Sequence, residues 1–414
     1  MKNRKLTALD RFLLGLSRET IHRVILVLLF AGSLIIRWKL APETTISSDY
    51  ELYIKGWPDT YRELGFVAGM RQVIGDYYVP FNIMYAVIGL SPWEPWVLAS
   101  LFSCIFDYLI AGLVYFLLRD LFLIRGAADA PLKAAYMSAL TCYLPFVFME
   151  SALWKQCDGF YIFFALLAVY LLLIKDRPTL AFAMLGISFS FKLQSVFFFP
   201  FFVLLYFLKK NFSILQFLWI PGCYLVAGLP AVLCGRGLRA TYFTYFMQMT
   251  EGTDYGTTSF SENYGMVANY PNAYNFGLDE YLGTLALPAV IFTMMLLALS
   301  VALAIRRDLR DPVRLLYLLA WQIWTCVMFL PSMHDRYDYG AVLLFSLLIA
   351  LLPRESVVPA CVLNIGTFII FIRAARMDAV GVSLHLLALI YLAAFFLTSW
   401  ILVHRLILLR EDGR

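Results

Sequence analysis

The sequence predicts an all-α polytopic membrane protein with a single transmembrane domain over residues 1–414, and three observations lead to this fold class. The 414 residues are 62% apolar and only 15% charged, with a mean hydropathy of +0.76, whereas soluble domains are about 45–50% apolar and about 25% charged. The apolar residues form runs long enough to cross a bilayer as helices. A transmembrane β-barrel would instead show short segments that alternate between apolar and polar residues.

Apolar runs bounded by charged or turn-forming residues predict about twelve spanning helices. They lie near residues 22–41, 94–118, 132–148, 159–174, 178–191, 194–208, 213–234, 281–305, 313–331, 339–352, 356–373 and 379–404. The segment 78–90 is apolar but short and contains Pro80 near its start, so we expect an interfacial or re-entrant helix there. The first run is long and lacks a small-residue cleavage site, which favours an uncleaved first span after a cytoplasmic tail of residues 1–23.

The charge distribution predicts the orientation of these helices. With the N-terminus inside, the majority of the 33 Lys and Arg residues fall on the cytoplasmic side, as the positive-inside rule requires. Both termini are then cytoplasmic, and two sizeable segments, 42–93 and 236–280, are outer loops. Since the inner loops are short, we expect any chemistry on the outer face of a plasma membrane.

Composition also argues against other classes of protein. The net charge of +5 comes mostly from cations in short loops beside apolar runs, where membrane topology explains them, so no nucleic-acid partner is predicted. The seven cysteines are scattered and include no C-x-x-C pair, which indicates neither a disulfide framework nor a metal site. The lipid bilayer is the partner that the composition predicts.

Four polar clusters interrupt the apolar sequence, and this topology places all four on the outer side. They are Asp49-Tyr50-Glu51, Trp154-Lys155-Gln156-Cys157-Asp158, Phe191-Lys192-Leu193-Gln194 and His334-Asp335-Arg336-Tyr337. A partly desolvated carboxylate at the membrane surface, such as Asp49, is suited to be a general base. The alternative for Asp49 is an ordinary solvated loop acid.

The cations and aromatic residues of these segments indicate the reaction in which such a base would take part. Lys192 lies in an almost unbroken apolar stretch, where an ammonium is costly unless it faces a polar cavity or snorkels to the surface. Arg336, with His334 beside it, follows a span, and Arg can hold a phosphate through two hydrogen bonds. Trp57 and its aromatic neighbours could cover sugar rings or lie at headgroup level. The combination suits transfer of a sugar from a lipid phosphate to a hydroxyl.

Six stretches between about residues 45 and 340 share an order and spacing with a known family. They are Ser48-Asp49-Tyr50 with Trp57 and Gly75-Asp76-Tyr77-Tyr78-Val79-Pro80-Phe81, then Phe106-Asp107-Tyr108, Ser151-Ala152-Leu153-Trp154-Lys155-Gln156-Cys157-Asp158, Ser190-Phe191-Lys192-Leu193-Gln194, Asn272-Ala273-Tyr274-Asn275 and His334-Asp335-Arg336-Tyr337. Together they resemble the bacterial multi-pass glycosyltransferases of the GT-C superfamily, in particular those related to the Gpi18-type mannosyltransferases. The fold that the resemblance implies is of GT-C type.

The resemblance also implies roles for single residues. The catalytic acid of the family falls on Asp49, with Glu51 a helper at best, and the cations that contact the donor phosphate fall on Lys192 and Arg336, with His334 next to them. The remaining residues are implied in substrate binding: Trp57, Trp154, Lys155, Gln156, Asp158, Gln194, Asn272, Tyr274, Asn275 and Tyr337.

Two positions depart from the family pattern. Lys155 stands where the family usually has a small residue, so it either adds a cation for the donor or is simply tolerated. Asp335 stands where a Glu is usual, which leaves the role of that position open. Asp107 lies within a predicted span, where an ionisable group is expensive, and a group that fixes helix packing is its favoured interpretation.

The function predicted on these grounds is an inverting glycosyltransferase that uses a polyprenyl-phosphate sugar donor and a glycan, glycolipid or protein acceptor, with the loop 236–280 as an acceptor lid or an inert connection. Many such enzymes need no metal; a divalent metal is not indicated here, its use is left open, and no cofactor is expected with certainty. The alternative from another class is a secondary transporter or lipid-linked sugar flippase, which would line a path through the bilayer with polar residues. Transfer of a whole oligosaccharide or phosphate group shares the same geometry.

Overall fold

The computed structural model describes residues 17–250, 265–375 and 381–408, together with Thr7, Asp10 and Gly15. These residues form helices and connecting turns, and the only β pairing among them is an isolated bridge between Val267 and Met333. Most of the expected tail 1–23 and the middle of the loop 236–280 lie outside the described residues.

The described helices follow the apolar runs of the sequence, and most connections between them are short. The longer helices are α2 Arg18–Leu40, α3 Gly56–Arg71, α4 Val79–Leu90, α5 Pro95–Ile124, α6 Ala130–Thr141, α8 Asp158–Leu173, α9 Pro178–Phe191, α10 Phe199–Lys209, α11 Trp219–Leu233, α14 Leu282–Arg306, α15 Pro312–Phe329, α16 Tyr339–Leu348, α17 Pro353–Ala375 and α18 Leu384–Ile401. Shorter helical segments are Tyr50–Lys55, α7 Pro145–Phe148, Met149–Leu153, Leu193–Phe198, Ile214–Leu218, α12 Leu238–Tyr242, α13 Thr244–Thr250, Asp279–Tyr281 and Leu402–Leu408.

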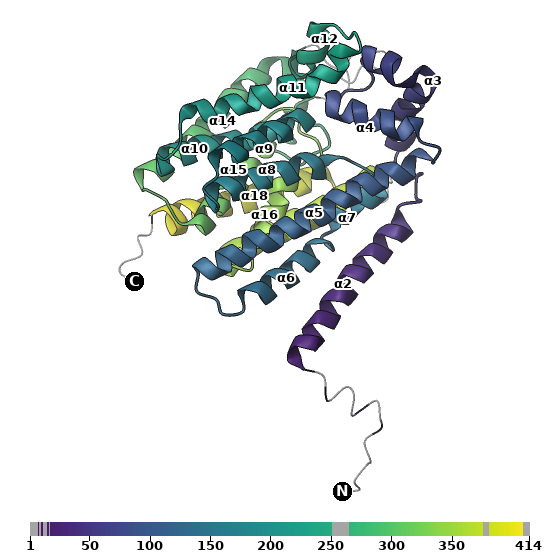
Figure 1. The fold of residues 1–414 in the computed structure, drawn as a ribbon. Coiled ribbons are helices and arrows are strands. Elements are labelled where there is room, and N and C mark those ends of the chain that lie inside the picture. The colour runs from purple at the N-terminus through teal and green to yellow at the C-terminus, as the bar shows by residue number, and fades with distance from the viewer. Residues whose placement is uncertain are drawn as a thin grey trace.

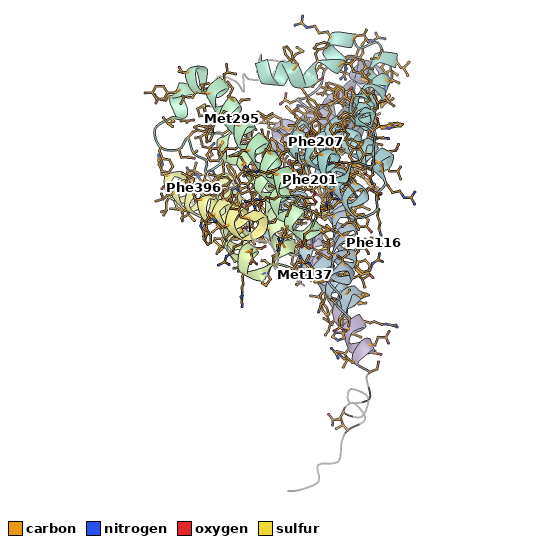
Figure 2. The ribbon with its side chains drawn as sticks, turned by 90° about the vertical axis from the view of Figure 1, so that its left-hand side faces the viewer. Phe116, Met137, Phe201, Phe207, Met295 and Phe396 are labelled. Carbon is orange, nitrogen blue, oxygen red and sulfur yellow. The ribbon has the colours of Figure 1, made fainter. Side chains whose placement is uncertain are left out.

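Seven of these helical stretches are long and apolar enough to cross a membrane, and the number rises to eight if the bent pair Ala130–Thr141 and Pro145–Leu153 is one span. The expected spans near 159–174, 178–191, 194–208 and 339–352 form shorter apolar helices. The chain is therefore a multi-pass helical membrane protein. Its exterior is that of a protein surrounded by lipid, because large apolar side chains such as Met295, Phe396, Phe116 and Phe207 are exposed around the bundle (Figure 2).

The expected interfacial segment forms α4, whose 12 residues extend only about 18 Å. Pro80 lies in its first turn, where the missing N–H of proline costs nothing. Helices α3 and α4 pack together and lie beside α11 and α12 at one end of the bundle, whereas α2 begins far from them (Figure 1).

Two apolar cores hold the bundle together. The larger one joins α5, α8, α9 and α10 to α15 through α18, and it includes the fully buried Trp324 and Phe201. The smaller one joins α3 and α4 to the beginnings of α5 and α8 and includes Tyr61 and Phe81. The turns that contain the four polar clusters lie where these two cores meet, since Trp154 belongs to the first core and Cys157 to the second.

Candidate active site

The Asp49 carboxylate is held by the turn that precedes α8. Asp49 precedes the short helix Tyr50–Lys55, and its Oδ2 accepts hydrogen bonds from Trp154 Nε1 at 3.0 Å and from Gln156 Nε2 at 3.1 Å. Arg336 Nη1 lies 3.8 Å from the same oxygen. Three segments that are far apart in the sequence thus meet at one carboxylate, which is 25% exposed.

Asp158 links the two predicted phosphate-binding cations. Its Oδ1 forms an ion pair with Lys192 Nζ, and its Oδ2 lies 3.6 Å from Arg336 Nε. The Asp158 side chain is fully buried and that of Lys192 nearly so, so each charge depends on the other, because an unpaired buried charge is very costly. The structure therefore brings the first, second, third and fourth polar clusters together.

The cations remain protonated in this setting. Burial is the largest single influence and would lower the pKa of Lys192, but Asp158, Cys157 and Tyr337 together outweigh it, and the pKa is raised. Burial likewise opposes the charge on Arg336, yet Asp335 and Asp158 raise its pKa well above the ordinary value. Aromatic rings stabilise both cations, since Lys192 Nζ lies 5.2 Å from the ring centre of Tyr337 and the Arg336 guanidinium lies 5.1 Å from that of Trp154.

The neighbouring His334 is a neutral group. Burial, together with the positive charges of Arg336 and Lys192, lowers its pKa to about 3. Any contact of His334 with a substrate phosphate at neutral pH would be a hydrogen bond rather than an ion pair. Its ring packs edge-on against Tyr337, with 5.3 Å between ring centres.

Lys155 points away from the two cations. Its ammonium donates to the carbonyl oxygens of Leu153 at 2.9 Å, Ala152 at 3.3 Å and Glu43. The side chain is buried, and burial lowers its pKa to about 8. The sequence left two interpretations open, a donor-binding cation or a tolerated departure. Neither of them included these three hydrogen bonds.

Glu51 and Trp57 interact with residues other than Asp49. Glu51 is exposed and pairs with Lys55 at 2.9 Å on the same helical turn. Trp57 packs against Tyr53, Tyr77 and Tyr85, with ring centres 5.0 to 5.8 Å apart. Gln194 places its Oε1 in a buried position without a hydrogen-bond partner among the described residues.

Among the predicted substrate residues of the loop 236–280, the two asparagines bond within the loop itself, whereas the Tyr274 hydroxyl bonds to the end of α15. Asn272 Oδ1 accepts from Tyr274 N at 2.9 Å, Asn275 Oδ1 accepts from Asn272 N at 2.7 Å, and Tyr274 OH donates to Phe329 O at 2.5 Å. The loop is also tied to the segment before His334, because Ser332 Oγ donates to Gly265 O at 2.8 Å. The two asparagines therefore hold the loop together, and residues 265–267 attach it to the segment before His334.

Asp107 has the structural role that was favoured for it. Arg37 near the end of α2 forms a buried ion pair with its Oδ2 at 2.7 Å, and Ser151 Oγ donates to the same oxygen at 2.5 Å. Arg37 also donates to Cys142 O at 3.0 Å. These contacts fasten α2, which is otherwise exposed along most of its length, to α5 and to the end of α6.

The sequence analysis missed Glu150, whereas Tyr77 was among the aromatic residues that it expected to cover sugar rings or to lie at headgroup level. Glu150 is buried and its Oε1 accepts from Asp158 N at 3.1 Å, while Tyr77 lies beside Lys192, with 5.9 Å between Nζ and the ring centre. The signal for Glu150 was available, since an acid within an apolar run is expensive unless it has a function. The position of Tyr77 beside Lys192 follows only from the packing of the first outer segment.

The arrangement has no ready-made metal centre. Within the described ranges, no group of three or more His, Cys, Asp or Glu side chains is placed to hold a metal ion. The groups that the site does offer are a partly exposed carboxylate and two largely buried cations. Comparison with known proteins adds no family, because no protein-family model and no curated protein sequence matches the chain.

Proposed function

We propose that this protein is a GT-C-type inverting glycosyltransferase that transfers a sugar from a polyprenyl-phosphate donor to a hydroxyl of an envelope glycan, glycolipid or protein. The observation that supports the proposal most is the position of Asp49, a partly exposed carboxylate 3.8 Å from a buried Arg336 that is linked through Asp158 to Lys192. A proton acceptor and two phosphate-binding cations are the groups that this transfer requires.

The proposed reaction is a single displacement. The acceptor hydroxyl oxygen attacks the anomeric carbon while its proton passes to Asp49 Oδ1, which accepts no hydrogen bond from the described residues. The bond between the anomeric carbon and the phosphate oxygen breaks, and the electron pair leaves with the polyprenyl phosphate. Arg336 and Lys192 stabilise the negative charge that develops there. A single attack from the opposite side inverts the anomeric centre.

The hydrogen bonds to Asp49 suit a base of this kind. Trp154 and Gln156 are neutral donors and both bind Oδ2, so they orient the carboxylate through one oxygen and leave the other for the acceptor proton. Arg336, the nearest cation, has its Nη1 at 3.8 Å, which is too long for a hydrogen bond. The carboxylate can therefore be held in place and still accept a proton.

The proposal includes an extracytoplasmic site. Helices α5 and α8 begin at the site and end near Arg119, Asp120 and Lys175, so this second group of charges lies at the opposite end of the bundle. Arg125 and Arg314 lie at that end as well. Cations near short loops favour the cytoplasmic side. With the shorter apolar helices also crossing the bilayer, the chain would have the expected twelve spans.

The test is the substitution Asp49→Asn in purified protein supplied with a polyprenyl-phosphate sugar and an acceptor. We expect sugar transfer to fall by about 10²-fold or more, because general-base catalysis contributes about 10²–10⁴-fold, while membrane insertion stays intact. Asp59→Asn is the matched control, since Asp59 lies in the same outer segment but pairs with Arg62 at an exposed position. Near-normal transfer by Asp49→Asn would remove the basis of the proposal.

A transporter would give a different result in the same preparation. Uptake of a lipid-linked or free sugar into vesicles, without any glycosyl product in the wild-type protein, would favour the transporter or flippase. Mass spectrometry of lipid-linked sugars and envelope polymers from a deletion strain would then identify the donor that accumulates and the substituent that is lost.

A further inference from the structure

Three consecutive residues form hydrogen bonds to the segment that contains Asp49. The side chains of Trp154 and Gln156 both bond to the Asp49 carboxylate, and Lys155 between them bonds to the carbonyl oxygen of Glu43, six residues before Asp49. The segment 43–49 is therefore held at its two ends by one turn. It connects the end of α2 with the short helix that follows Asp49.

The backbone of Lys155 is specialised for this arrangement. Lys155 has a φ of 57°, in the left-handed region that residues other than Gly, Asn and Asp rarely adopt. The unusual φ allows its side chain to point away from those of its neighbours, which face Asp49. Hydrogen bonds from Trp154 N to Met149 O and from Gln156 N to Glu150 O, both 2.9 Å, hold the turn on either side.

The ammonium of Lys155 is fully engaged with backbone oxygens. Two of its acceptors, Ala152 O and Leu153 O, lie at the end of the short helix Met149–Leu153, where unpaired carbonyls favour a cation. The third acceptor, Glu43 O, belongs to the segment of Asp49. An ammonium has three protons to donate, so no donor is left for a substrate phosphate.

From this geometry we infer that Lys155 is a positioning residue, whose ammonium fixes the segment 43–49 and thereby the distance between the Asp49 carboxylate and Arg336. It acts through Asp49 rather than on the substrate. The catalytic part of this inference rests on the proposed glycosyl transfer, whereas the structural part does not. A displacement of about 1 Å at a catalytic group can reduce a rate by about 100-fold, so a bond six residues away from the base can control turnover.

Two substitutions at position 155 separate the effect of the ammonium from the effect of the left-handed backbone. Lys155→Met keeps an unbranched side chain that ends at Cε and removes the ammonium, and Lys155→Gly removes the side chain while it relieves the left-handed φ. Lys133→Met is the matched control, because Lys133 is exposed near the start of α6. Hydrogen exchange measured by mass spectrometry on peptides that cover residues 41–55 reports on the segment without any need for activity.

We expect both variants at Lys155 to exchange faster than the wild type over residues 41–55, while Lys133→Met leaves this exchange unchanged. In the transfer assay kcat should fall by about 100-fold, with the KM for the donor changed far less. Unchanged exchange in both variants would refute the structural part. Faster exchange with normal kcat, or a rise in donor KM at constant kcat, would refute the positioning role and favour a donor-binding lysine.

The two proposals fail separately. If the wild-type protein transfers no sugar at all, the proposed function fails, while the exchange measurement still decides whether Lys155 fixes the segment. If the wild type is active and depends on Asp49, but the Lys155 variants match it in both measurements, only the role of Lys155 fails.

Discussion

The charged side chains at the two ends of the helical bundle differ in their exposure to solvent. At the site end, Asp158 and Lys192 are almost completely removed from solvent, Arg336 is only 13% exposed, and both cations lie next to Asp158. At the opposite end, the pairs Arg125–Asp311 and Arg310–Asp308 keep large parts of their side chains in contact with solvent. Ion pairs occur at both ends, but the pairs at the opposite end keep at least one partner in solvent: even the buried Asp120 pairs with Arg119 and Lys175, which are 29% and 41% exposed.

The difference indicates which charges serve stability. A surface ion pair contributes about 0–1 kcal/mol, so the exposed pairs connect loops at little cost and little gain. A buried pair seldom stabilises a fold more than apolar residues of the same shape would, yet removal of one partner costs about 3–5 kcal/mol. Retained buried charges are therefore better explained by a function for the site end than by stability.

The largest expected effect is that of Asp158→Asn. It leaves Lys192 buried without its partner, and we expect a loss of about 3–5 kcal/mol in the free energy of unfolding, measured by denaturation in detergent micelles. Asp311→Asn makes the same chemical change at the opposite end, where Asn can still cap α15, and should cost less than about 1 kcal/mol.

A double variant sharpens this comparison. Combining Asp158→Asn with Lys192→Gln removes both buried charges, so it should recover most of the stability lost in the single variant. Equal losses for Asp158→Asn and Asp311→Asn would contradict the distinction between the two ends.

A smaller effect on stability but a clear one on activity is expected for Arg336→Lys. The guanidinium reaches Asp49 through Nη1 and Asp158 through Nε, whereas a lysine offers one point charge that cannot span both carboxylates. We expect kcat for sugar transfer to fall by about 100-fold. Arg62→Lys, in the first outer segment, is the control, and wild-type turnover in Arg336→Lys would show that the fork geometry is not needed.

The smallest predicted effect is a change in pH dependence at Asp338, in the turn before α16. Its Oδ2 accepts from Tyr270 OH at 3.1 Å and from Thr367 Oγ1 at 3.2 Å, and burial raises its pKa from 3.8 to about 7. In that pH range the folded state binds more protons than the unfolded state, so this carboxyl makes the protein less stable as the pH rises.

Asp338→Asn keeps an acceptor for both hydroxyls and removes the titration. The gain in melting temperature of the variant over the wild type should therefore be larger at about pH 8 than at about pH 5. A gain of the same size at both pH values would show that Asp338 does not titrate between them. The comparison of the two ends does not depend on this outcome.

The sequence by itself determined the membrane class and most helix positions. The expected spans near 22–41, 94–118 and 281–305 correspond to Arg18–Leu40, Pro95–Ile124 and Asp279–Arg306, because a run of apolar residues is stable in lipid only when its backbone is hydrogen-bonded as a helix. The sequence also identified Asp49, Lys192 and Arg336 as a group, since charges next to apolar runs are few and costly.

The tertiary structure alone decided which partner each of these charged groups has. Asp158 is the common partner of Lys192 and Arg336, Lys155 binds carbonyl oxygens instead of facing the site, and Arg37 is buried against Asp107. Each pairing joins residues from different helices, and a single sequence does not specify which helices adjoin. Hydrophobicity acts residue by residue and can be recognised in the chain, whereas ion pairing depends on distances that exist only after the helices have packed.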